Sequence, residues 1–410
     1  MMKMSRTTKI ILIGLFVVTR LFIWVYRPVE FTDVVHNFMA YAHLWASGER
    51  PYLDQWYEYP PGTIPLFKLP HVVDMTTLNT PWHVDYATGY RLIMLVTDGL
   101  LFWFMWKVLI KSKVKSKIFV TAIIYYCLIT AKAHHFMYDK IDLLFAAATV
   151  FGVAVPILIG NSLKDKVLTW LGFFVAVSLK LINIPLGLIY LITQKKSLKQ
   201  SVLGLVIAFI LTLAVPVMYF RSSLLVMYVY HKERGLQVES VPAVIVSTIN
   251  KFTKSEQFVE VYKNYDIVGP VSAKVKAGFD VLFPVSLFVW LGYAVNKAWG
   301  VKSNGDRVLM DQYLSVLYIF IFMLTTKVLS TPFLLWHIPF LTIYPFRSSK
   351  LQLKLMSASL VIIAVSMTKI PDLNLGLVNL HLVIGWVRSG LILWILIEWF
   401  RQRKQLANIN

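Results

Sequence analysis

The chain has 410 residues, of which 57% are hydrophobic and only 15% are charged, and its mean hydropathy is +0.64. Soluble domains carry about a quarter charged residues, so this composition excludes a separate soluble catalytic domain and indicates a membrane protein. The net charge of +20 does not indicate nucleic-acid binding, because the basic residues form short tracts between apolar runs. These tracts lie at 111–117, 195–199, 347–354 and 401–404. They follow the positive-inside pattern, with anionic lipid headgroups as the counter-charge.

Long continuous apolar runs predict the helices, since a membrane span needs about 20 apolar residues. In chain order the predicted segments are 10–26, 90–110, 117–132, 140–159, 167–180, 182–193, 200–220, 279–297, 310–327, 332–346, 351–369 and 376–400. Two of them are short, and the fifth and sixth could form one broken hairpin. We therefore expect an all-α fold: a single integral membrane domain, 1–410, with about 10–12 transmembrane helices and interfacial helices in its outer loops.

The basic tracts also predict the orientation of these segments. With the N-terminus inside, every lysine-rich tract and the C-terminal basic cluster fall on the cytoplasmic side. The first apolar run begins after Lys9 and reads as an uncleaved span. We expect a multi-pass protein of the plasma membrane with two large outer loops, 27–89 and 221–278, of which the first carries seven acidic and three basic residues.

The first outer loop carries the chemically most informative pattern. Asp33 follows the first span closely, where an ionised carboxylate could take a proton from an attacking hydroxyl. An alternative is that Thr32 or Asp33 only caps a helix running to about residue 47. Aromatic residues at helical spacing predict that this helix, 33–47, lies on the membrane surface. These residues are Phe38, Tyr41 and Trp45.

In this loop the sequence resembles the GT-C superfamily, polytopic glycosyltransferases that use polyprenyl-phosphate sugars. The resemblance runs from Asp33 through Gly48–Tyr52 to Glu58–Pro61. Arg234–Ser240 looks like a loop motif of the bacterial enzymes. Lys327–Pro339 is similar to a late-helix motif of the family, but has Pro-Phe where that motif more often reads Gln-Tyr. Within the superfamily the chain is similar to the bacterial phosphatidylinositol-mannoside mannosyltransferase branch.

The resemblance implies inverting transfer of a hexose, with mannose expected, from a polyprenyl-phosphate donor to an acceptor hydroxyl on the outer face. The acceptor would be a glycolipid, a glycan or a protein. Asp33 takes the family's general-base position, and Arg234 could clamp the donor phosphate through its planar guanidinium. The expected substrate-binding residues are Glu58, Tyr59, Arg234, Gln237, Glu239, Lys327, His337 and Lys180. Lys132 is a further candidate for the phosphate charge.

A second role is open for several of these side chains. Glu58 and Glu239 are alternative bases should Asp33 only cap a helix. Lys180 could instead extend its ammonium group to the outer surface, and His337 could be a satisfied core histidine. No cofactor is expected, and a divalent metal is not expected either.

A metal site built from His134, His135 and Asp139 is disfavoured because adjacent histidines face different ways. A polar cluster that fixes helix ends is the favoured interpretation of these residues together with Tyr138 and Lys140. Asp98 and Asp142 lie inside predicted spans, which keeps a transporter or flippase of lipid-linked sugars as the alternative function. A non-catalytic subunit of a glycosylation complex is a third possibility.

Overall fold

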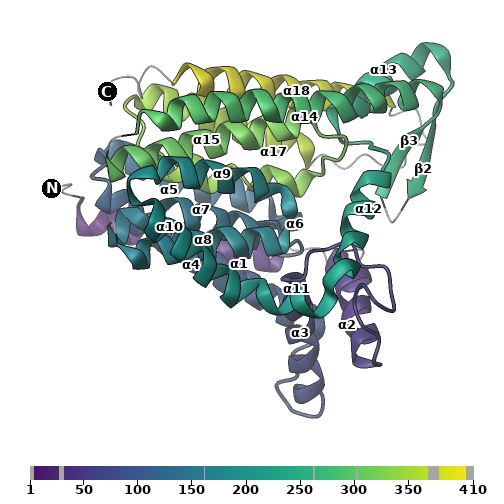
Figure 1. The fold of residues 1–410 in the computed structure, drawn as a ribbon, viewed down its shortest axis with the longest axis horizontal. Coiled ribbons are helices and arrows are strands. Elements are labelled where there is room, and N and C mark those ends of the chain that lie inside the picture. The colour runs from purple at the N-terminus through teal and green to yellow at the C-terminus, as the bar shows by residue number, and fades with distance from the viewer. Residues whose placement is uncertain are drawn as a thin grey trace. The chain divides into compact units, whose positions relative to one another are not determined.

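The computed structural model describes residues 4–26, 32–160, 162–261, 264–301, 303–367 and 378–402. These residues form helices and one small antiparallel sheet (Figure 1). The chain divides into two compact units, the first made of Met1–Lys232 and Thr342–Pro345, the second of Glu233–Leu341 and Phe346–Asn410. The expectation of a single integrated domain stays a prediction.

The first unit is built from helices, most of them apolar, with a longer connection between Ala46 and Thr63. Its elements are α1 (Arg6–Val25), η1 (Val34–Phe38), α2 (Met39–Ala46), α3 (Thr63–Thr77), α4 (Tyr86–Lys111), α5 (Ser116–Lys132), α6 (His134–Met137), α7 (Asp142–Ile159), α8 (Leu163–Leu179), η2 (Leu181–Asn183), α9 (Ile184–Thr193), η3 (Lys195–Ser197), α10 (Leu198–Thr212), α11 (Ala214–Phe220), η4 (Arg221–Leu224) and α12 (Leu225–Glu233). Four helices pack as a row of neighbours, in the order α4, α7, α8 and α10 (Figure 1). Glycines let α7 and α8 approach closely, because a Cβ added at Gly172 would lie 2.7 Å from the Cα of Gly152. Such small-residue contacts are typical of helix packing in membranes.

The second unit combines long helices with the sheet. Its elements are β1 (Leu236–Gln237), α13 (Val241–Thr253), β2 (Gln257–Val261), β3 (Asn264–Val268), α14 (Pro270–Trp299), α15 (Asn304–Thr325), η5 (Thr331–Leu335), α16 (Ile338–Ile343), α17 (Ser349–Ser366) and α18 (Val378–Arg401), the last residues of α16 being assigned to the first unit. The strands are ordered β1-β3-β2 and are antiparallel. A small core of Leu236, Ala243, Val246 and Ile267 fixes α13 against the sheet.

Every predicted apolar segment coincides with a helical element, which confirms an all-α polytopic membrane fold. Among the described residues, seven helices are long and apolar enough to cross a membrane: α1, α4, α7, α14, α15, α17 and α18. An eighth is reached if the bent pair Lys195–Thr212 and Ala214–Glu233 counts as one span; it bends by 56°. Pro216 lies at this bend, and a proline removes a helical hydrogen bond and kinks the helix. The remaining predicted segments are shorter helices. Residues 368–369 and 376–377, at the ends of the predicted segments 351–369 and 376–400, lie outside the described residues.

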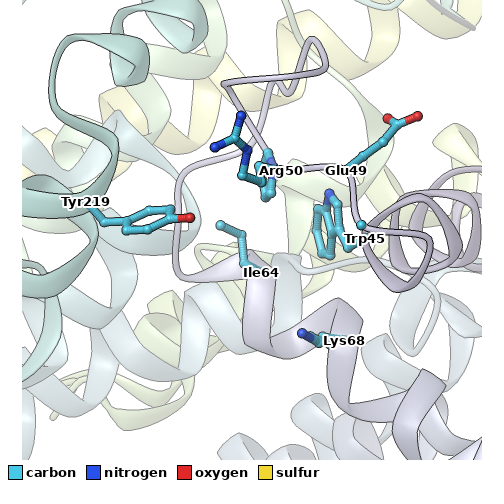
Figure 2. A pocket seen from close by; sticks show the side chains of 8 residues that line it. Trp45, Glu49, Arg50, Ile64, Lys68 and Tyr219 are labelled. Atoms are coloured by element: carbon cyan, nitrogen blue, oxygen red, sulfur yellow. The ribbon is translucent and has the colours of Figure 1, made fainter.

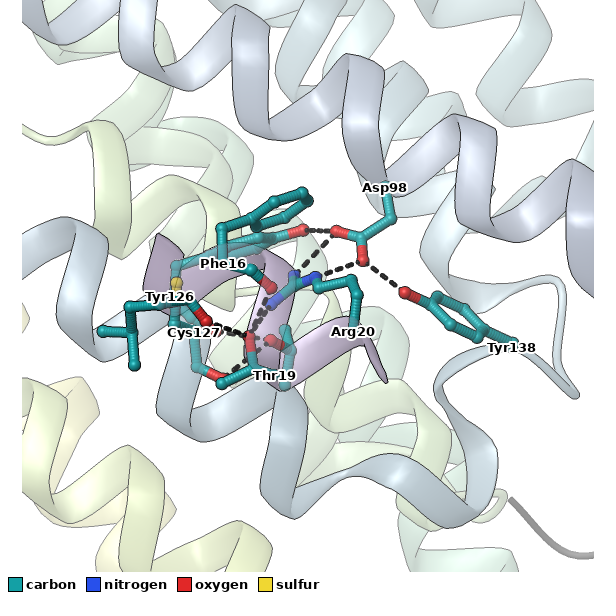
Figure 3. A network of polar contacts seen from close by, with 9 residues as sticks. Phe16, Thr19, Arg20, Asp98, Tyr126, Cys127 and Tyr138 are labelled. Carbon is teal, nitrogen blue, oxygen red and sulfur yellow. Dashed lines mark hydrogen bonds and ion pairs between the residues drawn. The ribbon is translucent and has the colours of Figure 1, made fainter. Parts of the chain in front are cut away.

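Charged side chains buried within the first unit form a satisfied network (Figure 3). The Arg20 guanidinium donates to both carboxylate oxygens of Asp98, at 2.7 and 2.8 Å. Tyr126 and Tyr138 donate their hydroxyls to the same carboxylate at 2.6 and 2.7 Å. Arg20 and Asp98 are 5% and 0% exposed. Since a buried charge is tolerated only when it is paired and hydrogen-bonded, this network accounts for the burial of Asp98 and ties α1, α4 and α5 together.

Candidate functional site

The predicted helix 33–47 is present, but its start differs from the simple cap that the sequence allowed. It consists of the π-helical turn η1 followed by α2. Asp33 precedes η1 in helical conformation, and its side chain makes no capping hydrogen bond. Its carboxylate instead contacts the Lys140 ammonium and accepts a hydrogen bond from the Asn37 amide at 3.2 Å. Asp33 is therefore placed for an ionic or chemical role and not for capping.

A second ion pair lies close to the first. The Lys180 ammonium donates to Asp142 at 2.8 Å, and it is also within electrostatic reach of Lys140 and Asp33. We call Asp33, Lys140, Asp142 and Lys180 the charge quartet. Asp33 and Lys140 are 28% and 29% exposed, whereas Asp142 and Lys180 are 4% and 18% exposed. The quartet thus combines a reachable ion pair with a more deeply held one.

The loop that carries Glu58 and Tyr59 is fixed next to this quartet. Glu58 accepts a hydrogen bond from the Tyr41 hydroxyl at 2.5 Å, which joins the loop to α2. Gly62 donates its N–H to the carbonyl of Ser178 at 2.8 Å, two residues before Lys180. A Cβ added at Gly62 would lie 2.2 Å from the Ser178 hydroxyl oxygen, so this approach requires glycine.

The Tyr59 hydroxyl is buried close to the carboxylates of Glu58 and Asp33. Burial raises the pKa of the Tyr59 hydroxyl well above its ordinary value, and the nearby carboxylates of Glu58 and Asp33 raise it further. Tyr59 therefore stays neutral at physiological pH and can donate a hydrogen bond close to Asp33. The sequence-predicted trio of Asp33, Glu58 and Tyr59 is brought together within the first unit.

The aromatic face of the helix over 34–46 packs inside the first unit. Phe38 stacks on Phe67 with ring centroids 4.1 Å apart, and Trp45 meets Tyr57 edge-on at 5.3 Å. Phe38 and Trp45 are 1% and 8% exposed. The aromatic spacing that predicted a surface helix therefore reflects core packing, and location of the helix at the membrane surface stays a prediction.

A small cavity lies beside the Gly48–Tyr52 motif (Figure 2). It has a volume of about 240 Å³, below the roughly 300–1,000 Å³ of ordinary ligand pockets. Its lining includes Trp45, Glu49, Arg50, Ile64, Lys68 and Tyr219. Arg50 is held by Asp54 through two hydrogen bonds of 2.8 Å. The cavity offers room for a small group only.

In the second unit, the two later motifs lie side by side. The Glu239 carboxylate accepts hydrogen bonds from the N–H and the hydroxyl of Thr331, at 2.9 and 2.8 Å. Gln237 donates its N–H to the carbonyl of Lys327 at 3.1 Å, and Arg388 donates to the carbonyl of Glu239. Both Glu239 oxygens are thus engaged in holding the two loops together, so the geometry favours a positioning role over the alternative role as base.

Arg234 and Lys327 belong to a mixed-charge cluster of the second unit. Lys327 lies 3.3 Å from Asp280, and both Arg234 and Lys327 act electrostatically on Asp266. Burial raises the pKa of Asp266, while these cations and the N–H of Gly235 oppose that rise. Arg234 is 5% exposed. The cluster thus places two cations beside two carboxylates, Asp266 and Asp280, where the sequence predicts phosphate binding.

The histidines have structural surroundings. His337 is fully buried, is hydrogen-bonded to the hydroxyl of Ser359, and lies against Phe320. His337 is thus a core histidine with one ring nitrogen bonded, while its Nδ1 has no hydrogen-bond partner among the described residues. Asp139 accepts from Arg91 at 2.6 and 2.9 Å. Among the described residues, no group of three or more His, Cys, Asp or Glu is arranged to hold a metal.

Sequence reasoning placed Lys140 in a polar cluster at helix ends and Tyr41 on an aromatic helix face, but it did not predict their contacts with Asp33 and Glu58. Lys140 lies 107 residues from its partner, so local patterns do not reveal the contact. The one signal in the sequence was that Lys140 lies between Asp139 and Asp142, directly before an apolar run.

Comparisons with known proteins give a limited result. No protein-family model matches the chain, and no curated protein matches it. Two crystal structures of ArnT from Cupriavidus metallidurans are similar to it. The apo structure has a TM-score of 0.49 at 13% identity, covering 95% of this chain and 76% of that chain. The structure bound to undecaprenyl phosphate has a TM-score of 0.45 at 15% identity, covering 97% and 78%. At these values the similarity does not decide the function.

Proposed function

We propose that the chain is an inverting membrane glycosyltransferase. It moves a hexose from a polyprenyl-phosphate donor to an acceptor hydroxyl on the outer face of the membrane. The proposal rests on the family resemblance of the three motifs and on the surroundings of Asp33. Mannose is the proposed sugar, because the motif pattern is similar to the mannosyltransferase branch.

The observation that supports the proposal most directly is the charge quartet. A base for hydroxyl deprotonation must be ionised and reachable, and Asp33 is 28% exposed with a lysine at contact distance. A phosphate leaving group needs positive charge, and the quartet supplies two ammonium groups. A reachable carboxylate beside two lysines is what transfer from a sugar phosphate requires of the protein.

The proposed reaction is a single displacement at the anomeric carbon. The acceptor oxygen forms a bond to that carbon while the bond to the donor phosphate oxygen breaks. Asp33 takes the proton of the acceptor hydroxyl, and polyprenyl phosphate leaves with the electron pair of the broken bond. General-base assistance of this kind contributes about 10²–10⁴-fold in rate.

Other residues would orient the substrates. Tyr59, neutral because of its raised pKa, can donate to a sugar or acceptor oxygen near Asp33. Glu58, held by Tyr41, can accept from a sugar hydroxyl. Arg234 and Lys327, which belong to the second unit, stay the phosphate ligands that the sequence predicts, since guanidinium and ammonium groups bind phosphate oxygens.

The alternative function as a transporter drew on the buried carboxylates Asp98 and Asp142. Asp98 is fully satisfied by Arg20 and two tyrosine hydroxyls, and Asp142 accepts from Lys180. A static buried network accounts for Asp98 without transport. The geometry therefore favours transfer.

The proposal is tested in lipid nanodiscs with polyprenyl-phosphate mannose and polyprenyl-phosphate glucose, radiolabelled in the sugar, and a mixed pool of glycolipid acceptors. We expect labelled glycolipid and released polyprenyl phosphate in equal amounts with the mannose donor. Movement of intact donor between leaflets, with the sugar–phosphate bond unbroken, would instead support the transporter.

A further inference from the structure

The ion pair between Asp33 and Lys140 poses a problem for a base. One carboxylate oxygen contacts the Lys140 ammonium and the other accepts from Asn37. Both oxygens of this carboxylate already have a donor, so an acceptor hydroxyl must compete with Lys140 or Asn37 to reach one of them. The structure therefore shows Asp33 in a held state.

The two lysines of the charge quartet differ in how firmly they are held. The partner of Lys180, Asp142, is 4% exposed, and their hydrogen bond measures 2.8 Å. Lys140 and Asp33 are each close to 30% exposed. A partly exposed pair is weak, because water competes for both charges. Lys140 also carries its ammonium on a flexible four-carbon chain, so it can exchange partners without movement of the backbone.

We propose that Lys140 holds Asp33 in the resting enzyme and exchanges it for the donor phosphate when the lipid-linked sugar binds. The donor phosphodiester brings one negative charge and accepts the Lys140 ammonium. Asp33 then loses its cationic partner and turns its freed oxygen to the acceptor hydroxyl. Base activation is thereby coupled to the presence of donor. This inference rests on the proposed function.

The exchange makes an unusual prediction for binding. Asp33 and the donor phosphate compete for one ammonium group, so removal of the Asp33 charge favours the phosphate. We expect Asp33→Asn to tighten binding of polyprenyl phosphate about three- to tenfold, as suits the loss of a weak competing pair. Lys140→Gln should weaken binding by a similar factor. In the Lys140→Gln background, Asp33→Asn should change nothing, because the contested group is gone.

The experiment measures polyprenyl-phosphate binding to the full-length protein in nanodiscs for the wild type, both single variants and the double variant. Lys117→Gln is the matched control, since Lys117 is an exposed lysine of the same unit, on α5. Lys140→Arg should keep most of the affinity, because it preserves the charge. Thermal unfolding of each variant identifies any that fail to fold, and the Lys140→Arg comparison still tests the role of the charge.

Three results have distinct meanings. Failure of the wild type to bind polyprenyl phosphate would overturn the proposed function itself. Binding that is unchanged or weakened in Asp33→Asn would overturn the exchange alone. Tightening that persists in the Lys140→Gln background would show simple charge repulsion by Asp33, and would also overturn the exchange.

Discussion

The buried network around Asp98 gives a stability prediction whose size follows from the structure. Asp98 accepts four hydrogen bonds, two from Arg20 and one each from Tyr126 and Tyr138. In Asp98→Asn the Arg20 guanidinium stays buried without a counter-charge. The NH₂ group of the new amide is a donor and would face the donors that the carboxylate accepted from. Breaking a buried pair from one side costs about 3–5 kcal/mol.

The remaining contacts of Arg20 do not compensate for this loss. Its guanidinium lies 4.0 Å from the ring centroid of Phe16 and 5.0 Å from that of Tyr126. Cation–π contacts contribute about 0.5–2 kcal/mol, and they are present before and after the substitution. The expected net loss therefore remains several kcal/mol.

The assay is thermal unfolding in nanodiscs, followed by tryptophan fluorescence at fixed heating rate. Asp54→Asn is the control, because it breaks an exposed pair with Arg50, for which about 0–1 kcal/mol is expected. The double variant Arg20→Met with Asp98→Leu should recover much of the lost stability by removing both charges. An unfolding midpoint for Asp98→Asn equal to that of Asp54→Asn would refute the reasoning.

Three further substitutions test other contacts of the two units. Hydrogen bonds from the first N–H groups of α14 hold the pKa of Glu256 below its usual value although burial opposes this. The contribution of the Glu256 carboxylate to stability is therefore fully present above the pKa that the group has in the unfolded chain. It is lost as pH falls through the lower pKa of the folded protein. Glu256→Gln should cost about 1 kcal/mol at neutral pH and nothing at acidic pH, as unfolding midpoints across pH will show. Gly62→Ala forces a Cβ against Ser178. It should lower the free energy of unfolding by about 1–3 kcal/mol and also lower the rate of transfer. An unchanged transfer rate would contradict the tight approach. Glu239→Ala removes both hydrogen bonds to Thr331, costing about 1–3 kcal/mol, and should raise hydrogen exchange in 234–240 and 327–332.

The helices could be predicted from the sequence because apolar run length decides them. Each predicted segment coincides with a helix, and the helix over 34–46 follows the spacing of Phe38, Tyr41 and Trp45. The bend after Thr212 was missed, although Pro216 marks it. The number of membrane crossings depends on several short helices whose length alone does not decide whether they span.

The contacts that define the site could not be predicted in the same way. Strands β2 and β3 are five residues each and lie in the segment 221–278, which the sequence predicts to be an outer loop. Their short mixtures of polar and apolar residues give little periodic signal. The Asp33–Lys140 and Glu239–Thr331 contacts join residues 107 and 92 positions apart. Such pairs depend on tertiary packing, which local patterns do not encode. The motifs nevertheless contain Asp33 of the first pair and both members of the second.

The role of Asp33 as the general base is tested most directly by one measurement. Transfer from polyprenyl-phosphate mannose is followed under saturating donor for the wild type, Asp33→Asn and Glu58→Gln in the same nanodiscs. We predict that Asp33→Asn lowers the rate of transfer about 10²–10⁴-fold without weakening donor binding, and that Glu58→Gln has a smaller effect. Transfer at the wild-type rate in Asp33→Asn would contradict the central claim.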